Sequence, residues 1–278
     1  MGSLKYLVIN ADDFGFTRDV NEGIVEAHRN GILTATTLMA NGSAFDDAVR
    51  LTGETPTLDI GCHLTLIGGN SLLDPARRLP SSTSELTAQV YAGKIAIYDE
   101  LEAQVRKILA SGIQPTHLDT HKHTHLLPPV LRAVCSIAEN FGIRWVRRPV
   151  DFRAASAGEW KQRVIGRFVR RVDIGPVLDA HGLRHTDHFW GFAITGRLDE
   201  AALAGVMAHM PEGSTELMTH PGILTEELAA EPTRLKESRA VELKALVSPL
   251  ARKAVNDAGI ELVNYRQLDQ MGTWKKRC

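Results

Sequence analysis

The sequence predicts an α/β fold in which parallel strands form a sheet and helices cover it. Short apolar runs alternate about seven times with segments of helical periodicity, which is typical of chains that build parallel sheets. The 278 residues have ordinary globular composition, 44% hydrophobic and 23% charged, and suffice to bury a core without disulfide bonds. No internal repeat or linker divides the chain, so we expect a single domain over residues 1–278. The pattern alone leaves a closed barrel and an open sheet as alternatives.

The predicted strands are short apolar runs. The first is continuous apart from Lys5, as expected of a strand buried on both faces. The third alternates apolar and polar residues, as a half-buried strand does. The sixth ends at Pro221, which has no amide hydrogen to continue a ladder. In chain order, the runs are residues 4–9, 35–40, 58–66, 116–120, 143–148, 216–220 and 260–264.

The predicted helices repeat apolar residues with the helical period. In the first, Val20, Ile24 and Ala27 form one stripe, and Gly31 ends it. Residues 67–98 interrupt the alternation with a long loop insertion rich in Pro, Ser and Gly, and such loops are usually functional or mobile. In chain order, the helical segments are residues 19–30, 43–53, 99–111, 128–141, 160–172, 203–210 and 235–258.

Composition excludes several function classes. The 32 Lys and Arg nearly balance the 33 Asp and Glu, so no nucleic-acid partner is expected. Three scattered cysteines cannot build a disulfide framework or a thiolate metal site. No run approaches the roughly 18–20 apolar residues of a transmembrane segment, and the first apolar run is too short for a signal peptide. We therefore expect a cytoplasmic protein with reduced cysteines.

Two adjacent carboxylates follow the first predicted strand. Functional residues gather at the carboxyl ends of parallel strands, and Asp12 and Asp13 occupy that position. Buried carboxylates are costly unless they meet a cation or hydrogen-bond donors. One of them could bind a metal while the other stays free as a base. The alternative is an acid pair that stabilises the start of the next helix.

The strongest signal is a cluster of histidines near the middle of the chain. Every odd position from 117 to 125 is His or Asp, namely His117, Asp119, His121, His123 and His125. If the strand period of two persists, these five side chains share one face. A buried face cannot hold them without a metal or a dense hydrogen-bond network. An exposed loop is the alternative.

Two further histidines lie at predicted strand ends. His63 lies in the third strand, and a single histidine there is more often a hydrogen-bonded core residue than a ligand. His220 precedes Pro221, and it could protonate a leaving group or simply occupy a turn. Their shared position with Asp12 and Asp13 indicates one site.

Several motifs together resemble a known family. Residues 10–15, 21–24, 41–42, 61–63, 117–125 and 218–221 read NADDFG, NEGI, NG, GCH, HLDTHKHTH and MTHP. In these the chain resembles the YdjC-type carbohydrate deacetylases, which include chitooligosaccharide deacetylases and deacetylases linked to hopanoid biosynthesis. The resemblance implies a distorted (β/α) barrel of about seven parallel strands. It is weakest at residues 67–98 and 150–200, where substrate choice would be made.

The resemblance also implies an activity, the hydrolysis of an N-acetylated amino sugar, oligosaccharide or glycolipid, to a free amine and acetate. It implies that Asp13, His63 and His121 bind a divalent metal ion, Mg²⁺ or Zn²⁺, with Asp12 as the general base. His220 corresponds to the late histidine of the family and is our candidate general acid. The rest of the cluster, His123 and His125, would support the ligands or contact substrate.

Other features carry weaker expectations. Arg148, at a predicted strand end, could stabilise an oxyanion or bind a hydroxylated ring, and Trp190 could stack on a sugar or pack in the core. The basic helix predicted at residues 160–172 could touch an anionic membrane, although an ordinary surface helix is favoured. A homodimer is a further possibility. The competing functions are another barrel metal hydrolase, such as an amidohydrolase or phosphoesterase, and a non-catalytic sugar- or metal-binding protein.

Overall fold

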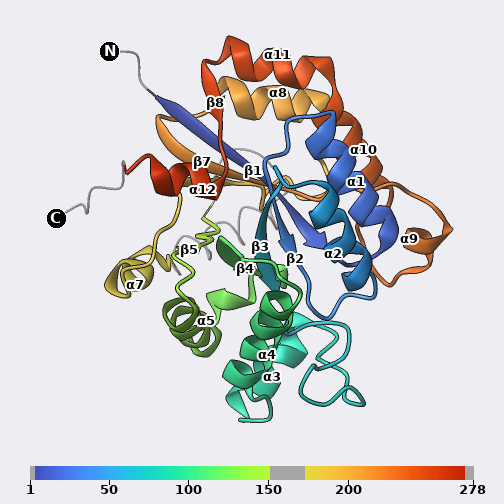
Figure 1. The fold of residues 1–278 in the computed structure, drawn as a ribbon, viewed down its shortest axis with the longest axis vertical. Helices are drawn as coiled ribbons and strands as arrows, with labels where there is room; N and C mark the ends of the chain where they lie inside the picture. The colour runs from blue at the N-terminus through green and yellow to red at the C-terminus, as the bar shows by residue number, and fades with distance from the viewer. Residues whose placement is uncertain (1–3, 151–172, 273–278) are drawn as a thin grey trace.

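The computed structural model of the chain describes residues 4–150 and 173–272. In this part of the chain, a curled half-barrel of parallel strands runs in the order β5-β4-β3-β2-β1-β7-β6, and β8 also pairs with β1 (Figure 1). The predicted distorted α/β barrel is confirmed. The strands are β1 (Lys5–Phe14), β2 (Ala35–Leu38), β3 (Asp59–Leu64), β4 (His117–Thr120), β5 (Trp145–Val146), β6 (His188–Trp190), β7 (Gly213–Thr219) and β8 (Ile260–Leu262).

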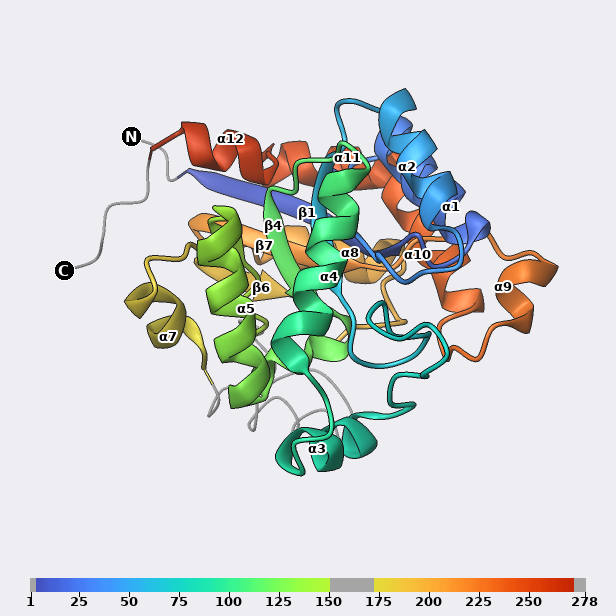
Figure 2. The ribbon, with the colours of Figure 1, turned by 60° about the horizontal axis from the view of Figure 1, so that its bottom comes forward.

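Helices surround this sheet (Figures 1 and 2). Their apolar stripes join the strands in one large core. The helices are α1 (Arg18–Arg29), α2 (Phe45–Glu54), α3 (Thr83–Tyr91), α4 (Ile97–Ala110), α5 (Pro128–Phe141), α7 (Gly175–Ala180), α8 (Glu200–Ala208), α9 (Glu226–Ala230), α10 (Glu237–Val247), α11 (Pro249–Asp257) and α12 (Tyr265–Gln270). Among the described residues, none of the helices is long and apolar enough to span a membrane.

The strand β1 lies at the centre of the sheet. It pairs with β7 on one side, and on the other with β8 near its start and β2 near its end. We predicted that the strand ends at Ile9, but it continues to Phe14, so Asp12 and Asp13 lie within its last residues. Their side chains find buried partners there, which offsets the cost of placing carboxylates in a central strand.

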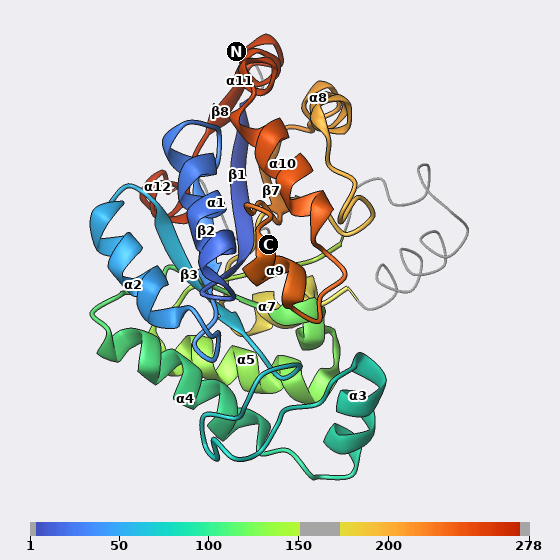
Figure 3. The same cartoon turned by 90° about the vertical axis from the view of Figure 1, so that its right-hand side faces the viewer.

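Other predicted boundaries also differ from the structure. The helix predicted at residues 235–258 is two helices, because Pro249 cannot donate the hydrogen bond that continuity requires and starts α11 instead. The insertion at residues 67–98 contains α3, which Ser82 caps and which lies at the periphery (Figures 2 and 3). Strand β6 was not predicted, since its three residues carry no clear alternation. The basic segment 160–172 lies outside the described residues.

Candidate metal and catalytic site

Charged and imidazole side chains converge at the carboxyl ends of the central strands. Asp12 and Asp13 lie at the end of β1, His63 and Asp119 near the ends of β3 and β4, and His220 directly after β7. This is the edge at which parallel sheets place functional residues.

Three potential ligand atoms converge on one point. The Nε2 atom of His63 lies 3.3 Å from Asp13 Oδ1, and His121 Nδ1 lies 3.2 Å from the same oxygen. The two imidazole nitrogens are 3.3 Å apart. Asp13 Oδ1 is buried, yet it forms no hydrogen bond with any residue that the structure describes.

This triangle fits a divalent metal ion. Ligand atoms about 2.0–2.2 Å from one tetrahedral ion lie roughly 3.4 Å apart, close to the separations found here. Nitrogen and carboxylate donors suit Zn²⁺ and several other ions. His121 is the ligand candidate that reaches solvent, since its side chain is 25% exposed, whereas those of Asp13 and His63 are 6% and 1% exposed. The three residues could therefore hold an ion, with His121 on the side that reaches solvent.

Asp119 orients His63. Its Oδ1 atom lies 2.7 Å from His63 Nδ1, which leaves Nε2 facing Asp13. Such a carboxylate behind a histidine ligand fixes the orientation of the ring and raises its basicity. Burial opposes protonation of His63, but Asp119, Asp13 and Asp12 outweigh it and raise the pKa of His63 to about 10. The imidazole of His63 is therefore surrounded by negatively charged carboxylates.

Arg147 is a buried cation of the site, and the sequence analysis singled out its neighbour Arg148 instead. It directs two nitrogens at Asp12, at 2.6 and 2.7 Å, and also contacts Asp119 and Glu216 at 2.7 Å. The strand period of two could have predicted its burial, because Trp145 and Arg147 lie on the same face of the predicted strand and both are buried. Arg148 points elsewhere and pairs with Asp173, with its Nε atom 2.7 Å from Oδ1.

Asp12 is held as an ionised carboxylate. Burial alone would raise the pKa of Asp12, but the charge and hydrogen bonds of Arg147 outweigh this and hold it well below the ordinary value. Asp12, His63 and Asp119 form a second group with metal-like spacing. Because Arg147 already pairs with both of these carboxylates, the group fits a cation less well than the Asp13 group does.

His220 faces Asp12 across the site. Its Nε2 atom lies 4.0 Å from Asp12 Oδ2. Burial lowers the pKa of His220 to about 4, against the opposing effect of the nearby carboxylates. At neutral pH the imidazole of His220 is therefore uncharged.

The histidine cluster does not continue as a strand. β4 ends at Thr120, and residues His121–Leu126 form a 3₁₀ turn in which Lys122 and His123 adopt positive φ angles of 53° and 52°. The turn separates the histidines that a continued strand would have placed on one face. His125 is fully buried behind the site, with its nitrogens near Thr120 Oγ1 and the carbonyl of Arg147.

The remaining members of the cluster have different surroundings. The Nε2 atom of His117 lies 3.0 Å from the side-chain oxygen of Asn10, and the imidazole ring stacks on Tyr265. His123 packs against Phe192, with ring centroids 5.2 Å apart, and against Phe189. Trp190 is half-buried and packs against the main core at the end of β6.

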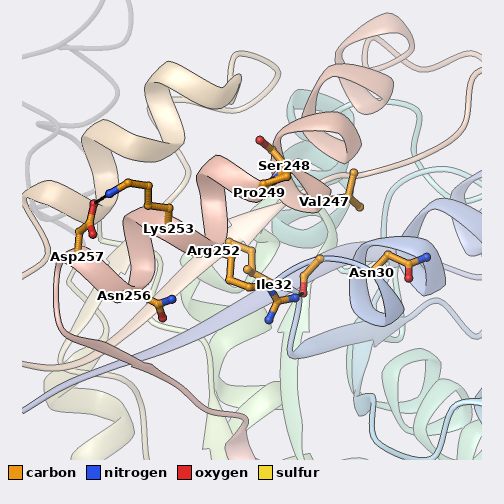
Figure 4. A pocket seen from close by; sticks show the side chains of 10 residues that line it. Asn30, Ile32, Val247, Ser248, Pro249, Arg252, Lys253, Asn256 and Asp257 are labelled. Atoms are coloured by element: carbon orange, nitrogen blue, oxygen red, sulfur yellow. Dashed lines mark hydrogen bonds and ion pairs between the residues drawn. The ribbon is translucent and has the colours of Figure 1, made fainter.

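A cavity on the surface lies apart from this site. It has a volume of about 460 Å³ and is lined by the end of α1 and by α11, at the amino ends of the strands (Figure 4). Its charged residues include the ion pair of Lys253 and Asp257. None of the residues proposed for the metal site contributes to it.

Comparisons with known proteins agree on one family. A family model described as YdjC-like protein matches residues 6–257. A carbohydrate deacetylase of Brevibacillus brevis is 35% identical over 269 residues, which cover 94% of this chain and 99% of that protein. A chitooligosaccharide deacetylase of Klebsiella pneumoniae is 31% identical and covers 95% of this chain and 99% of that protein. Among solved structures, a proposed cellobiose-phosphate cleavage protein of Enterococcus faecalis V583 shares the fold, with a TM-score of 0.74, 24% identity and coverage of 96% and 99%.

Proposed function

We propose that this chain, which belongs to the YdjC-like protein family, removes the acetyl group from an N-acetylated amino sugar by metal-dependent hydrolysis. The observation that carries the proposal is the convergence of Asp13 Oδ1 with two imidazole nitrogens at 3.2 and 3.3 Å, beside a separate carboxylate. Relatives named carbohydrate deacetylase and chitooligosaccharide deacetylase, matched over almost their whole length, support the reaction and the substrate class.

The proposal assigns the metal to three atoms. Asp13 Oδ1, His63 Nε2 and His121 Nδ1 would hold a divalent ion. When bound, such an ion would acidify a water molecule and polarise the acetyl carbonyl. Three protein ligands leave positions open, as catalytic sites require and structural sites do not.

Asp12 and His220 would move the proton. Asp12 is ionised and accepts a proton from the attacking water, whose oxygen bonds to the acetyl carbon. Asp12 would pass this proton to His220, whose Nε2 atom lies 4.0 Å from Asp12 Oδ2 and whose imidazole is uncharged at neutral pH. His220 then protonates the amine as the carbon–nitrogen bond breaks, and acetate remains.

The test combines metal analysis with acetate release. We expect purified protein to bind one divalent ion and to release acetate from N-acetylated sugars, assayed over oligosaccharides and glycolipids. Asp13→Asn and His121→Ala should lose the ion and the activity together. The exposed residues Asp46 and His209 supply matched controls, Asp46→Asn and His209→Ala, which should retain both.

The outcome also separates the competing functions. Phosphate release without acetate release would indicate another barrel hydrolase. Tight metal binding with no turnover of any acetylated sugar would indicate a binding protein, and either result would overturn the proposal.

A further inference from the structure

Helix α10 presents two buried charged residues to the site, and no part of the reaction described above uses them. Arg239 and Glu242 lie three residues apart, on one face of the helix, and each is only 1% exposed. Figure 3 shows α10 beside α1, close to the central strand β1. Long charged side chains are rarely buried this completely without paired partners.

Arg239 forms a buried ion pair with the candidate metal ligand Asp13. Its Nη2 atom donates to Asp13 Oδ2, and its Nε atom donates to the carbonyl of Leu235 at 3.2 Å. The contact occupies one carboxylate oxygen and leaves Oδ1 to face His63 and His121. The guanidinium thus selects which oxygen of Asp13 points at the metal site.

Glu242 holds the backbone around His220. Its Oε2 atom accepts the amide hydrogen of His220 at 2.6 Å, and Oε1 accepts that of Gly196 at 3.2 Å. One carboxylate therefore joins the loop after β7 to the loop after β6. Burial raises the pKa of Glu242 to about 7, although these amides and Arg239 lower it.

The loop that carries His220 is packed tightly against the same helix. The amide of Gly222 donates to the carbonyl of Arg239 at 3.2 Å. A Cβ atom at Gly222 would lie 3.2 Å from Arg239, and one at Gly23 of α1 would lie 2.5 Å from Gly222. The loop is therefore in close contact with both α10 and α1 at Gly222.

We infer that α10 is a positioning element of the active site, in which Arg239 sets the ligand geometry of Asp13 and Glu242 sets the position of His220. The inference rests on the proposed function and extends it to two residues with separable roles. Arg239 acts on metal binding, whereas Glu242 touches none of the metal-ligand candidates and acts on the chemical step.

The experiment measures the two roles separately. Metal-free protein is titrated with Zn²⁺ and with Mg²⁺ by calorimetry, and kcat and KM are measured at saturating metal. Arg239→Gln should weaken metal binding about 10–100-fold, the usual effect of losing a group that orients a ligand, and Arg239→Lys should lie between it and the wild type. Glu242→Gln should bind metal as the wild type does, with kcat reduced about 10-fold or more and KM unchanged.

The matched control is Glu237→Gln, an exposed residue on the same helix, which should match the wild type in every measurement. If both the Arg239 and Glu242 variants behave like this control while the wild type binds metal and releases acetate, the inference is wrong and the proposed function stands. If the wild type itself binds no metal, the proposed function fails first. If Glu242→Gln does not fold, the two Arg239 variants still decide the metal-binding half, and a wild-type affinity in both would overturn it.

Discussion

At the scale of single residues, the site contains more buried carboxyl groups than buried guanidinium groups. Five buried carboxyl groups meet two buried guanidinium groups, those of Arg147 and Arg239; the acids are Asp12, Asp13, Asp119, Glu216 and Glu242. Such an excess of negative charge is costly in a low-dielectric interior unless a cation or protons offset it. It explains the raised pKa of His63, whereas the pKa of Glu242 is raised mainly by burial. A divalent cation binds favourably in such a negative environment.

Arg147 offsets three of these carboxylates and should be essential to the fold. We expect Arg147→Met to lower the free energy of unfolding by about 3–5 kcal/mol, since it leaves several buried charges without their partner. Urea denaturation at neutral pH measures the effect. The neighbouring variant Arg148→Met removes a half-buried pair with Asp173 and a 3.5 Å contact with the carbonyl of Asp187, and it should cost at most about 1 kcal/mol. An equal decrease in the free energy of unfolding for both variants would contradict the role of Arg147 as the partner of three buried carboxylates.

Glu242 should make stability depend on pH in a predictable direction. Its pKa is raised from 4.5 to about 7 in the folded protein, so the native state holds this proton more tightly than the unfolded chain. Between these pH values the native state binds more protons, and the free energy of unfolding therefore falls as pH rises. Glu242→Gln should remove this fall, so that its stability relative to the wild type increases from about pH 4.5 to 7 and is constant above.

Urea denaturation over this pH range tests the expectation. Glu237→Gln should run parallel to the wild type, because that side chain is exposed. Parallel curves for Glu242→Gln as well would show that the folded protein does not raise the pKa of this carboxyl.

The residues of the candidate site were only partly predictable from the sequence. Asp12, Asp13, His63 and His121 could be grouped because each lies where a predicted parallel strand ends. Arg239 could not, since it lies 226 positions from Asp13 and meets it only in the folded chain. Its neighbours show an ordinary helical pattern, which gives no sign that this arginine points inward.

At the scale of elements, backbone contacts place the functional side chains. The turn after β4 carries His121 toward Asp13, and the loop after β7 carries His220 toward Asp12. A strand period of two could not predict the turn, because its positive φ angles occur at Lys122 and His123, where no glycine signals a turn. Pro249, by contrast, is a signal in the sequence for the break between α10 and α11.

Two glycines in helices give a matched test of the packing behind His220. Gly23→Ala should destabilise the protein by about 1–3 kcal/mol, because the new Cβ atom would meet the backbone of Gly222 at 2.5 Å. The displaced loop should also lower kcat, since His220 lies two residues away. Gly205→Ala in α8, where a Cβ would contact nothing within 4 Å, should be neutral or stabilising by about 0.4–1 kcal/mol. Similar behaviour of the two variants would mean that the loop can move freely.

At the scale of the whole molecule, the fold was the most predictable feature. The alternation of apolar runs and helical segments dictates a parallel sheet, and the motif resemblance selects the distorted barrel. The order of strands in the sheet could not be read from the pattern, although it places β1 at the centre. That position brings Asp12 and Asp13 between residues from β3, β4 and β7, so the sheet itself assembles the site.

Because the metal ligands come from distant parts of the chain, an ion bound to them should stabilise the whole fold. The ligands lie on β1, β3 and the turn after β4, and the unfolded chain cannot present them together. At a free metal concentration 100 times Kd, binding should add about 2.7 kcal/mol to the free energy of unfolding. Thermal unfolding of chelator-treated protein, with and without added Zn²⁺ or Mg²⁺, should show a rise in Tm that saturates with metal. Asp13→Asn should abolish the rise, whereas Asp46→Asn should preserve it, and a metal-induced rise that survives in Asp13→Asn would place the ion elsewhere.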